Sequence, residues 1–298
     1  MMKFNIEHDF ITTPDGLKLP YLLHKSNKTS NKNLVVFVHG AGSSTILRLS
    51  KFLNNLAGKL NAIDFDLLAF NNRGAGYITK YDTADGKSMI YGMSFEQIAD
   101  FEKDFKGVLD WAKATGYNYI SLVGHSTGAN KIVYLGAKGK LPMPVKSLVL
   151  IGGGDDITLQ RDRYKKEELD KVEEQLKVIK DGRELVPSEL FPGEHPISWH
   201  SLSELITRGS NYDMFPFGAE KPKFKLEELM KKYPIPTLCM YGENDFGTII
   251  PVKQAVKNLE RFKGVKVETI PSAGHDFNKY ENQFNTAIVN FIEEITGG

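Results

Sequence analysis

The stretch YISLVGHSTGANKIVYLG, residues 119–136, changes its hydrophobic pattern in the middle, and that change decides the fold class. Its first five residues form a short apolar run, which is typical of a strand that is covered on both faces. From residue 128 onward the apolar side chains recur at helical spacing, which predicts a helix over residues 128–138. The residues between, GHSTG at 124–128, are predicted to form a sharp turn. Such a strand, turn and helix form the repeating unit of a parallel α/β sheet.

The serine in the centre of this turn is the candidate nucleophile. A residue in such a turn has a strained backbone, and its neighbours two positions before and after must lack side chains. Gly124 and Gly128 meet this requirement. The turn raises the hydroxyl of Ser126 above the strand ends, where the following helix directs its first N–H groups. The alternative is a glycine-rich turn without a chemical role, so the interpretation depends on whether the sequence also supplies partners.

The partner that a serine needs is a base, usually a histidine held in one tautomer by a carboxylate. His275, in SAGHDF at 272–277, follows the last predicted strand and precedes the final helix. It is therefore expected at the C-terminal edge of the strands, where open α/β sheets bind their ligands. The other six histidines lie in the predicted hairpin, in glycine-rich motifs or in the segment between residues 155 and 233. We therefore interpret His275 as the base.

Four carboxylates compete for the role of orienting that histidine. Asp245, in YGENDFGTIIP at 241–251, comes just after another predicted strand, at the same edge of the sheet. The order serine, aspartate, histidine along the chain is the one that hydrolases with a strand-to-helix serine turn use. Glu243 lies two residues earlier, and Asp155 and Asp156 follow another strand, so these three remain open as alternatives to Asp245.

Acyl transfer also needs backbone N–H groups that receive the negative charge on the substrate oxygen. The first predicted donor is the N–H of Thr127, directly after the nucleophile. The second is expected in the loop after the early strand at 34–38, where the sequence reads HGAG at 39–42. We assign it to the N–H of Ala41, with a flexible glycine loop as the alternative.

Similar apolar runs predict the other strands of the sheet. The runs are at 34–38, 66–70, 119–123, 147–151, 237–241 and 265–270. Helical patterns lie at 94–115, 128–138, 252–262 and 280–295. Before them, residues 3–12 and 17–23 alternate apolar and polar side chains around PDG at 14–16, which predicts an antiparallel hairpin. Strands that alternate with helices indicate a doubly wound, mostly parallel sheet.

The segment 155–233 contains no convincing strand and is densely charged, so we predict a helical cap inserted into a core formed by 1–154 and 234–298. Within it, residues 191–218 are rich in aromatic, histidine and proline residues. We expect this stretch to face the site and to shape substrate specificity. The side chains predicted to bind substrate are Trp199, His200, Met214 and Phe215.

The composition favours a globular protein that acts on a small molecule. Lys and Arg total 38 and Asp and Glu total 37, so the net charge of +1 favours neither nucleic acid nor an anionic membrane. The one cysteine, Cys239, lies in an apolar run and is interpreted as a buried strand residue. No signal peptide or membrane span is recognised, so a soluble, cytoplasmic protein is expected. No dinucleotide, phosphate or zinc motif occurs, so no cofactor or metal is predicted, and the oligomeric state stays open.

The motifs HGAG, NNRGAG, GHSTG, GENDFG and AGHDF occur in this order, and with them the sequence resembles the α/β-hydrolase superfamily over nearly its whole length. The resemblance implies an eight-stranded sheet whose second strand is antiparallel, with a Ser126, Asp245 and His275 triad and oxyanion donors at Ala41 and Thr127. GHSTG and the segment ISWHSLSELITRGSNYDMF also resemble the branch that includes siderophore ester hydrolases.

We therefore expect a serine hydrolase that cleaves a small-molecule carboxylic ester through an acyl-enzyme. The preference for esters rests on the ease with which an alcohol leaves and on how common esterases are in the superfamily. The alternatives are a peptidase or amidase, a lactone or siderophore ester hydrolase on the same triad, and a non-catalytic ligand-binding protein that has the fold.

Overall fold

An eight-stranded sheet forms the centre of the molecule, in the strand order β1-β2-β4-β3-β7-β8-β9-β10. The computed structural model describes residues 5–27, 32–42, 48–141, 145–193 and 195–297. The strands of the sheet are β1 (Asn5–Thr12), β2 (Lys18–Lys25), β3 (Asn33–Val38), β4 (Asp66–Phe70), β7 (Tyr119–His125), β8 (Val145–Ile151), β9 (Thr237–Gly242) and β10 (Val265–Ile270).

The strand directions confirm the predicted fold. β2 runs antiparallel to both of its neighbours, β1 and β4, and every other neighbouring pair in the sheet is parallel. The predicted hairpin at 3–12 and 17–23 corresponds to β1 and β2; residues 3 and 4 lie outside the described residues. The chain therefore has the α/β-hydrolase arrangement, with an antiparallel second strand at one side of a parallel sheet.

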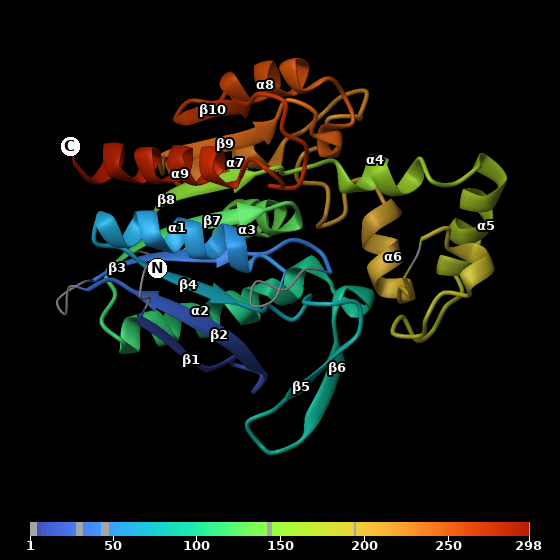
Figure 1. The fold of residues 1–298 in the computed structure, drawn as a ribbon. Coiled ribbons are helices and arrows are strands. Elements are labelled where there is room, and N and C mark those ends of the chain that lie inside the picture. Colours follow the sequence, from blue (N-terminus) through green and yellow to red (C-terminus); the bar gives the residue numbers. More distant parts are fainter. Residues whose placement is uncertain (1–4, 28–31, 43–47, 142–144, 194, 298) are drawn as a thin grey trace.

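Helices cover both faces of the sheet (Figure 1). α1 (Ser50–Ala62) and α9 (Glu281–Thr296) pack on one face. α2 (Phe101–Ala114), α3 (Thr127–Ala137), α7 (Lys225–Lys232) and α8 (Val252–Glu260) pack on the other. Because side chains alternate along a strand, Val35 and Phe37 of β3 join the first core, whereas Val36 and Val38 join the second. This two-sided burial explains why the strands read as continuous apolar runs.

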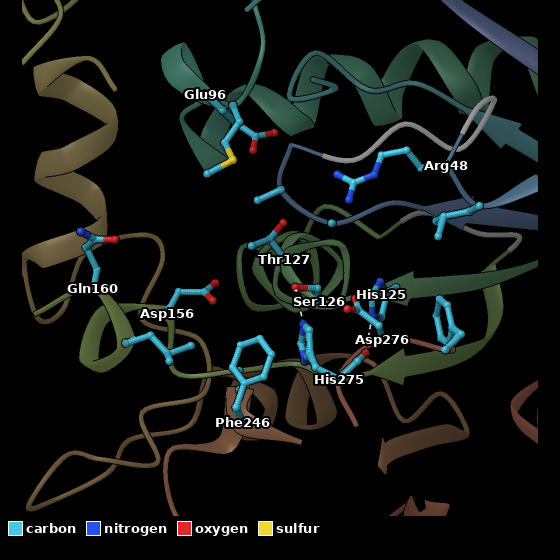
Figure 2. A pocket seen from close by; sticks show the side chains of 18 of the residues that line it. Arg48, Glu96, His125, Ser126, Thr127, Asp156, Gln160, Phe246, His275 and Asp276 are labelled. Atoms are coloured by element: carbon cyan, nitrogen blue, oxygen red, sulfur yellow. Dashed lines mark hydrogen bonds between the residues drawn. The ribbon is translucent and has the colours of Figure 1, made fainter. Parts of the chain in front are cut away.

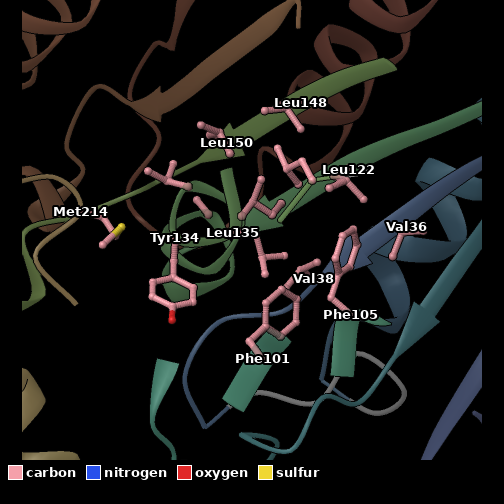
Figure 3. Packing of buried hydrophobic residues seen from close by; sticks show 14 of the residues in the cluster. Val36, Val38, Phe101, Phe105, Leu122, Tyr134, Leu135, Leu148, Leu150 and Met214 are labelled. Carbon is pink, nitrogen blue, oxygen red and sulfur yellow. The ribbon is translucent and has the colours of Figure 1, made fainter. Parts of the chain in front are cut away.

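The core between α2, α3 and the sheet is densely packed (Figure 3). Phe101 and Phe105 of α2 lie against apolar side chains of β3 and β7, among them Val38 and Leu122. Each of these four side chains is at least 98% buried. Burial of one such side chain contributes about 1.5–3 kcal/mol, so this core holds α2 firmly against the sheet.

The predicted helix at 94–115 is shorter in the structure. α2 begins at Phe101, after two short 3-10 helices, η1 (Met93–Phe95) and η2 (Ile98–Asp100). Between them, Glu96 and Gln97 are extended, with ψ angles of 132° and 135°. The small antiparallel pair β5 (Thr79–Asp82) and β6 (Ser88–Tyr91) precedes these turns and projects from the molecule (Figure 1). The extended residues 96 and 97 therefore interrupt the predicted helix ahead of α2.

The predicted insertion is helical, and most of it extends beyond the strand ends (Figure 1). Its helices are α4 (Asp156–Arg161), α5 (Lys166–Leu176), the 3-10 helix η3 (Ser188–Leu190) and α6 (Trp199–Ile206). α5, α6 and the chain between them share their own small apolar cluster, which includes Val172, Ile197 and Leu202. α7 differs, because its Leu226 and Leu229 lie in the core of the sheet. The last part of 155–233 therefore packs with the core, and α4 to α6 form the projecting part.

Among the described residues, no helix combines the length and apolar character that crossing a bilayer requires. Cys239 is fully buried in β9 and unbridged, as predicted. Burial raises the pKa of its thiol to about 12, so the side chain is an inert part of the core.

Candidate active site

Ser126 lies between the end of β7 and the start of α3, in the strained conformation that the GHSTG pattern predicts. Its φ and ψ angles are 57° and −128°, a region that residues other than glycine rarely adopt. A Cβ atom at Gly128 would lie 2.1 Å from the carbonyl oxygen of Val38, and one at Gly124 would lie 2.6 Å from that of Gly128. The two glycines are therefore required sterically, because strand, turn and helix approach one another too closely for any side chain.

The hydroxyl of Ser126, the imidazole of His275 and the carboxylate of Asp245 form one hydrogen-bonded chain (Figure 2). Ser126 Oγ lies 2.9 Å from His275 Nε2, and His275 Nδ1 lies 2.8 Å from Asp245 Oδ1. Asp245 also accepts a hydrogen bond from the N–H of Gly247 at 2.8 Å. A carboxylate at Nδ1 fixes the tautomer in which Nε2 is the free base. The structure thus brings together three side chains that the sequence separates by up to 149 positions.

The three competing carboxylates have other partners. Asp155 accepts two hydrogen bonds from Arg208, at 2.9 and 3.0 Å, and also caps α4. Asp156 accepts from the amide of Asn130 at 2.8 Å. Glu243 accepts from a backbone N–H in the loop before His275. Of the four predicted candidates, Asp245 is the one whose carboxylate is hydrogen-bonded to the imidazole.

Nearby carboxylates change the proton affinity of His275. Burial by itself lowers the pKa of His275, but the hydrogen bond and charge of Asp245, together with the charges of Asp156 and Asp276, outweigh it. The net pKa is raised above its ordinary value. His125 behaves in the opposite way, since burial and the neighbouring His275 lower its pKa to about 4. His125 is therefore neutral near pH 7, and its Nε2–H donates to the carbonyl oxygen of His275 at 3.0 Å, which helps to hold that loop.

The two predicted oxyanion donors both lie beside the nucleophile. Thr127 is the first residue of α3, so its N–H has no acceptor within the helix. Ala41 lines the same cavity as Ser126, and a Cβ atom on its neighbour Gly40 would lie 2.8 Å from the Cβ of Ser126. The loop that carries Ala41 therefore touches the nucleophile, which is the placement that a second donor needs.

His39 holds the loop of Ala41 in place. Its Nε2 accepts from the N–H of Asn72 at 3.1 Å, so the proton is on Nδ1, which donates to the carbonyl oxygen of Gly40 at 2.7 Å. Burial, with the charge of Lys131, lowers the pKa of His39 to about 3, and the ring stays neutral. The imidazole thus links the loops after β3 and β4.

A cavity of about 660 Å³ opens above Ser126 (Figure 2). On one side it is lined by α4, through Asp156, Leu159 and Gln160, and on the opposite side by residues before and at the start of α1. Glu96 and Met93 line a third side, and Phe246 lies beside the imidazole with ring centroids 4.7 Å apart. This volume is in the range of small-molecule sites.

The four side chains predicted to bind substrate are not among the described residues that line this cavity. Trp199 packs in the cluster of the projecting helices, and His200, one residue on, is exposed. Met214 and Phe215 lie in the core of the sheet, as Figure 3 shows for Met214. The sequence-based assignment of these four residues is therefore corrected.

The same stretch does reach the cavity, but through other residues. On α6, Ser201 and Leu205 lie one helical turn apart and line the cavity, whereas Trp199, Leu202 and Ile206 lie on a neighbouring face and pack in the cluster of the projecting helices. His195 and Tyr212 also line it. The composition of 191–218 identified the segment correctly. Which side chains of α6 face the cavity, however, depends on how the insertion packs against the rest of the protein.

Several residues that line the cavity were not predicted from the sequence, and Glu96 is the clearest example. Its side chain is 3% exposed and forms a buried ion pair with Lys131 of α3, which is fully buried. Lys131 also donates to the side-chain oxygen of Asn72 at 3.1 Å. Neither residue belongs to a motif, because their juxtaposition depends on the extended backbone at 96–97. No group of three or more histidine, cysteine or acidic residues suited to a metal ion occurs within the described ranges.

Comparison with known proteins identifies the family of this chain. A family model described as "Serine aminopeptidase, S33" matches residues 29–281. The mouse protein "Serine hydrolase BPHL" is 24% identical over 279 residues, which cover 89% of this chain and 87% of that protein.

Two solved structures show the same fold. Est1E of Butyrivibrio proteoclasticus, solved with ferulic acid, has a TM-score of 0.64 and 19% identity over 97% of this chain and all of its own. The Pyrococcus furiosus esterase Pf2001 has a TM-score of 0.62 and 16% identity over 99% and 92% of the two chains. The family model covers well over half of the sequence, from before β3 to the start of α9. The chain therefore belongs to the serine aminopeptidase S33 family, and with it to the α/β-hydrolase superfamily of serine hydrolases.

Proposed function

We propose that the protein hydrolyses a carboxylic ester of a small molecule in two steps through an acyl-enzyme on Ser126. His275 Nε2 takes the proton of the attacking hydroxyl and gives it to the departing alcohol. It then takes a proton from a water molecule that attacks the acyl carbon, and gives this proton to the departing oxygen of Ser126, which releases the acid and restores the serine. Asp245 holds the imidazole and stabilises its charged form, and the N–H groups of Ala41 and Thr127 receive the negative charge of each tetrahedral intermediate.

The observation that carries this proposal is the continuous hydrogen-bonded chain from Asp245 to the strained Ser126, at the base of a cavity. A strained backbone persists only where the surrounding structure enforces it, and such strain gathers at functional sites. A non-catalytic protein with this fold would have no need for the strain and the chain together. We also propose that α4 to α6 act as a cap over the cavity, since α4 and α6 both line it.

A fluorophosphonate probe tests the proposed nucleophile, because only an activated serine is labelled. The wild type should be labelled at one residue, and Ser126→Ala should abolish labelling. Ser188→Ala, which removes an exposed hydroxyl from η3, is the matched control and should be labelled like the wild type. Labelling that survives in Ser126→Ala, or no labelling of the wild type, would remove the basis for the proposal.

The choice between an ester and an amide substrate rests on the relatives of the protein and not on the geometry of the site. The structural relative Pf2001 favours esters, since it is described as an esterase. The family description favours an aminopeptidase as the second candidate. p-Nitrophenyl butyrate, p-nitrobutyranilide and alanine p-nitroanilide should therefore be compared. A higher kcat/KM on either anilide would overturn the preference for esters. The lactone and siderophore ester alternatives stay as predictions, to be tested with those substrates.

A further inference from the structure

Phe246 places an exposed aromatic ring inside the cavity. The residue is 62% exposed, whereas the other two phenylalanines of the cavity wall, Phe52 and Phe277, are 2% and 4% exposed. Of the large apolar side chains that are exposed in the described part of the chain, Phe246 is the one that lines the cavity. Covering an apolar ring that water surrounds is favourable, so a ligand in the cavity gains free energy by contacting it.

The backbone on both sides of Phe246 is buried and hydrogen-bonded. The side chain of Asp245 accepts from the N–H of Gly247 at 2.8 Å, and the carbonyl oxygen of Gly247 accepts from the N–H of Asp155 at 3.0 Å. Asp245 and Gly247 are both buried. These contacts fix the backbone around Phe246, so the structure holds the exposed ring in a defined place.

That place is next to the catalytic base. The ring centroids of Phe246 and His275 are 4.7 Å apart, and the ring planes are inclined by 43°. Figure 2 shows Phe246 beside His275, on the side where Asp156 of α4 lies. His275 has to give its proton to the oxygen of the departing alcohol, so this oxygen must come within about 2.6–3.2 Å of Nε2. The alcohol part of an ester therefore lies beside the imidazole, where it can contact Phe246.

Other side chains add apolar surface to the same cavity. Met93 of η1, Leu159 of α4 and Leu205 of α6 line it, and each of them is half-buried. The hydrophobic effect grows with the apolar area that is removed from water. A methyl or ethyl group covers little of the ring of Phe246, whereas a bulky apolar group covers much of it.

We propose that Phe246 determines specificity by binding the alcohol part of the substrate, and that this alcohol carries a bulky apolar group such as an aromatic ring. This inference rests on the proposed ester hydrolysis and adds the class of alcohol. An aromatic alcohol gains a ring-to-ring contact with Phe246 in addition to the burial of apolar area.

Two butyrate esters of primary alcohols, 2-phenylethyl butyrate and ethyl butyrate, test the proposal. The value of kcat/KM covers the steps up to the departure of the alcohol, so it reports contacts that the enzyme makes with the alcohol. In the wild type, kcat/KM should be about tenfold or more higher for the 2-phenylethyl ester. A factor of ten corresponds to about 1.4 kcal/mol, which the burial of roughly 55 Å² of apolar surface supplies.

Three variants assign this preference to Phe246. Phe246→Ala should reduce the ratio of the two kcat/KM values at least about threefold, because the ring is lost. Phe246→Tyr, which retains the ring, should retain the ratio. Phe10→Ala is the matched control, since it removes a ring that is 53% exposed on β1, and it should also retain the ratio. Both positions are exposed, so the variants should fold, which melting temperature and fluorophosphonate labelling verify.

Ethyl 4-phenylbutyrate places the same ring on the acyl part of the ester. If Phe246→Ala weakens the preference for this ester over ethyl butyrate and leaves the preference for 2-phenylethyl butyrate unchanged, the placement of the alcohol beside Phe246 is wrong.

A wild-type ratio below about tenfold, or a reduction of less than about threefold in Phe246→Ala, would overturn the proposal while leaving ester hydrolysis intact. If the wild type hydrolyses none of the three esters and is not labelled by the fluorophosphonate, the proposed function fails, and this inference fails with it.

Discussion

Replacing Lys131 with methionine should be among the most destabilising single changes in this protein. The ammonium group of Lys131 is fully buried and pairs with Glu96, whose side chain is 3% exposed. Methionine keeps most of the apolar stem that packs near the ring of Phe101. The variant therefore removes the charge with little loss of volume. It leaves the carboxylate of Glu96 buried without a cation, and the side-chain oxygen of Asn72 loses its hydrogen bond at 3.1 Å.

The expected loss in the free energy of unfolding is about 3–5 kcal/mol, which is the usual cost of removing one partner from a buried ion pair. A loss of about 4 kcal/mol corresponds to a change of roughly 10³ in the ratio of folded to unfolded protein. The cost comes mainly from the carboxylate of Glu96. Burial deprives this carboxylate of its hydration, and without Lys131 no cation compensates for that loss. Adding Glu96→Gln to Lys131→Met should therefore recover at least about half of the loss.

Urea denaturation at pH 7 measures these differences, with the wild type, both single variants and the double variant in parallel. Lys106→Met on α2 is the matched control, because its ion pair with Asp110 is more than 60% exposed on both sides. It should cost less than about 1 kcal/mol. The reasoning would be refuted if Lys131→Met costs less than about 1 kcal/mol. It would also be refuted if the double variant loses as much as the two single variants added together.

Three further predictions concern the catalytic chain. Because the base must be neutral and the pKa of His275 is raised, kcat/KM should fall as the pH drops through an apparent pKa above 6.5, and a midpoint below 6 would contradict the structure. Asp245→Asn should lower kcat by roughly 10⁴-fold with little change in melting temperature, whereas a loss below tenfold would exclude its role at Nδ1. Gly128→Ala, whose Cβ would lie 2.1 Å from the oxygen of Val38, should abolish labelling of Ser126, and near-normal labelling would show that the turn tolerates a side chain.

The core of the fold could be predicted from the sequence because its signals are local. Strands buried on both faces must be apolar throughout, and helices packed by one face must repeat at helical spacing, so the runs at 34–38 or 147–151 mark their elements directly. The strands β3, β4 and β7 to β10 all contain a predicted run. Helix α1 and the pair β5 and β6 lie outside the predicted elements. The pair is short, with Met89 and Ile90 exposed, so its pattern carries no burial signal.

The serine turn could likewise be predicted from the sequence, because the two glycines that it requires sterically lie within the same five residues, 124–128. The choice among Asp245, Glu243, Asp155 and Asp156 was not, because all four follow strands that end at the same edge of the sheet. Only the tertiary structure shows that Asp155 is hydrogen-bonded to Arg208, whereas Asp245 is hydrogen-bonded to the imidazole of His275.

What the sequence alone determined, then, was the order of the strands along the chain, the strained turn at Ser126 and the edge of the sheet where its partners gather. Each of these follows from the periodicity and steric needs of neighbouring residues. The tertiary structure alone decided which face of α6 lines the cavity and that Lys131 meets Glu96. These outcomes depend on contacts between residues far apart in the chain, and no local pattern encodes the distance between two such side chains.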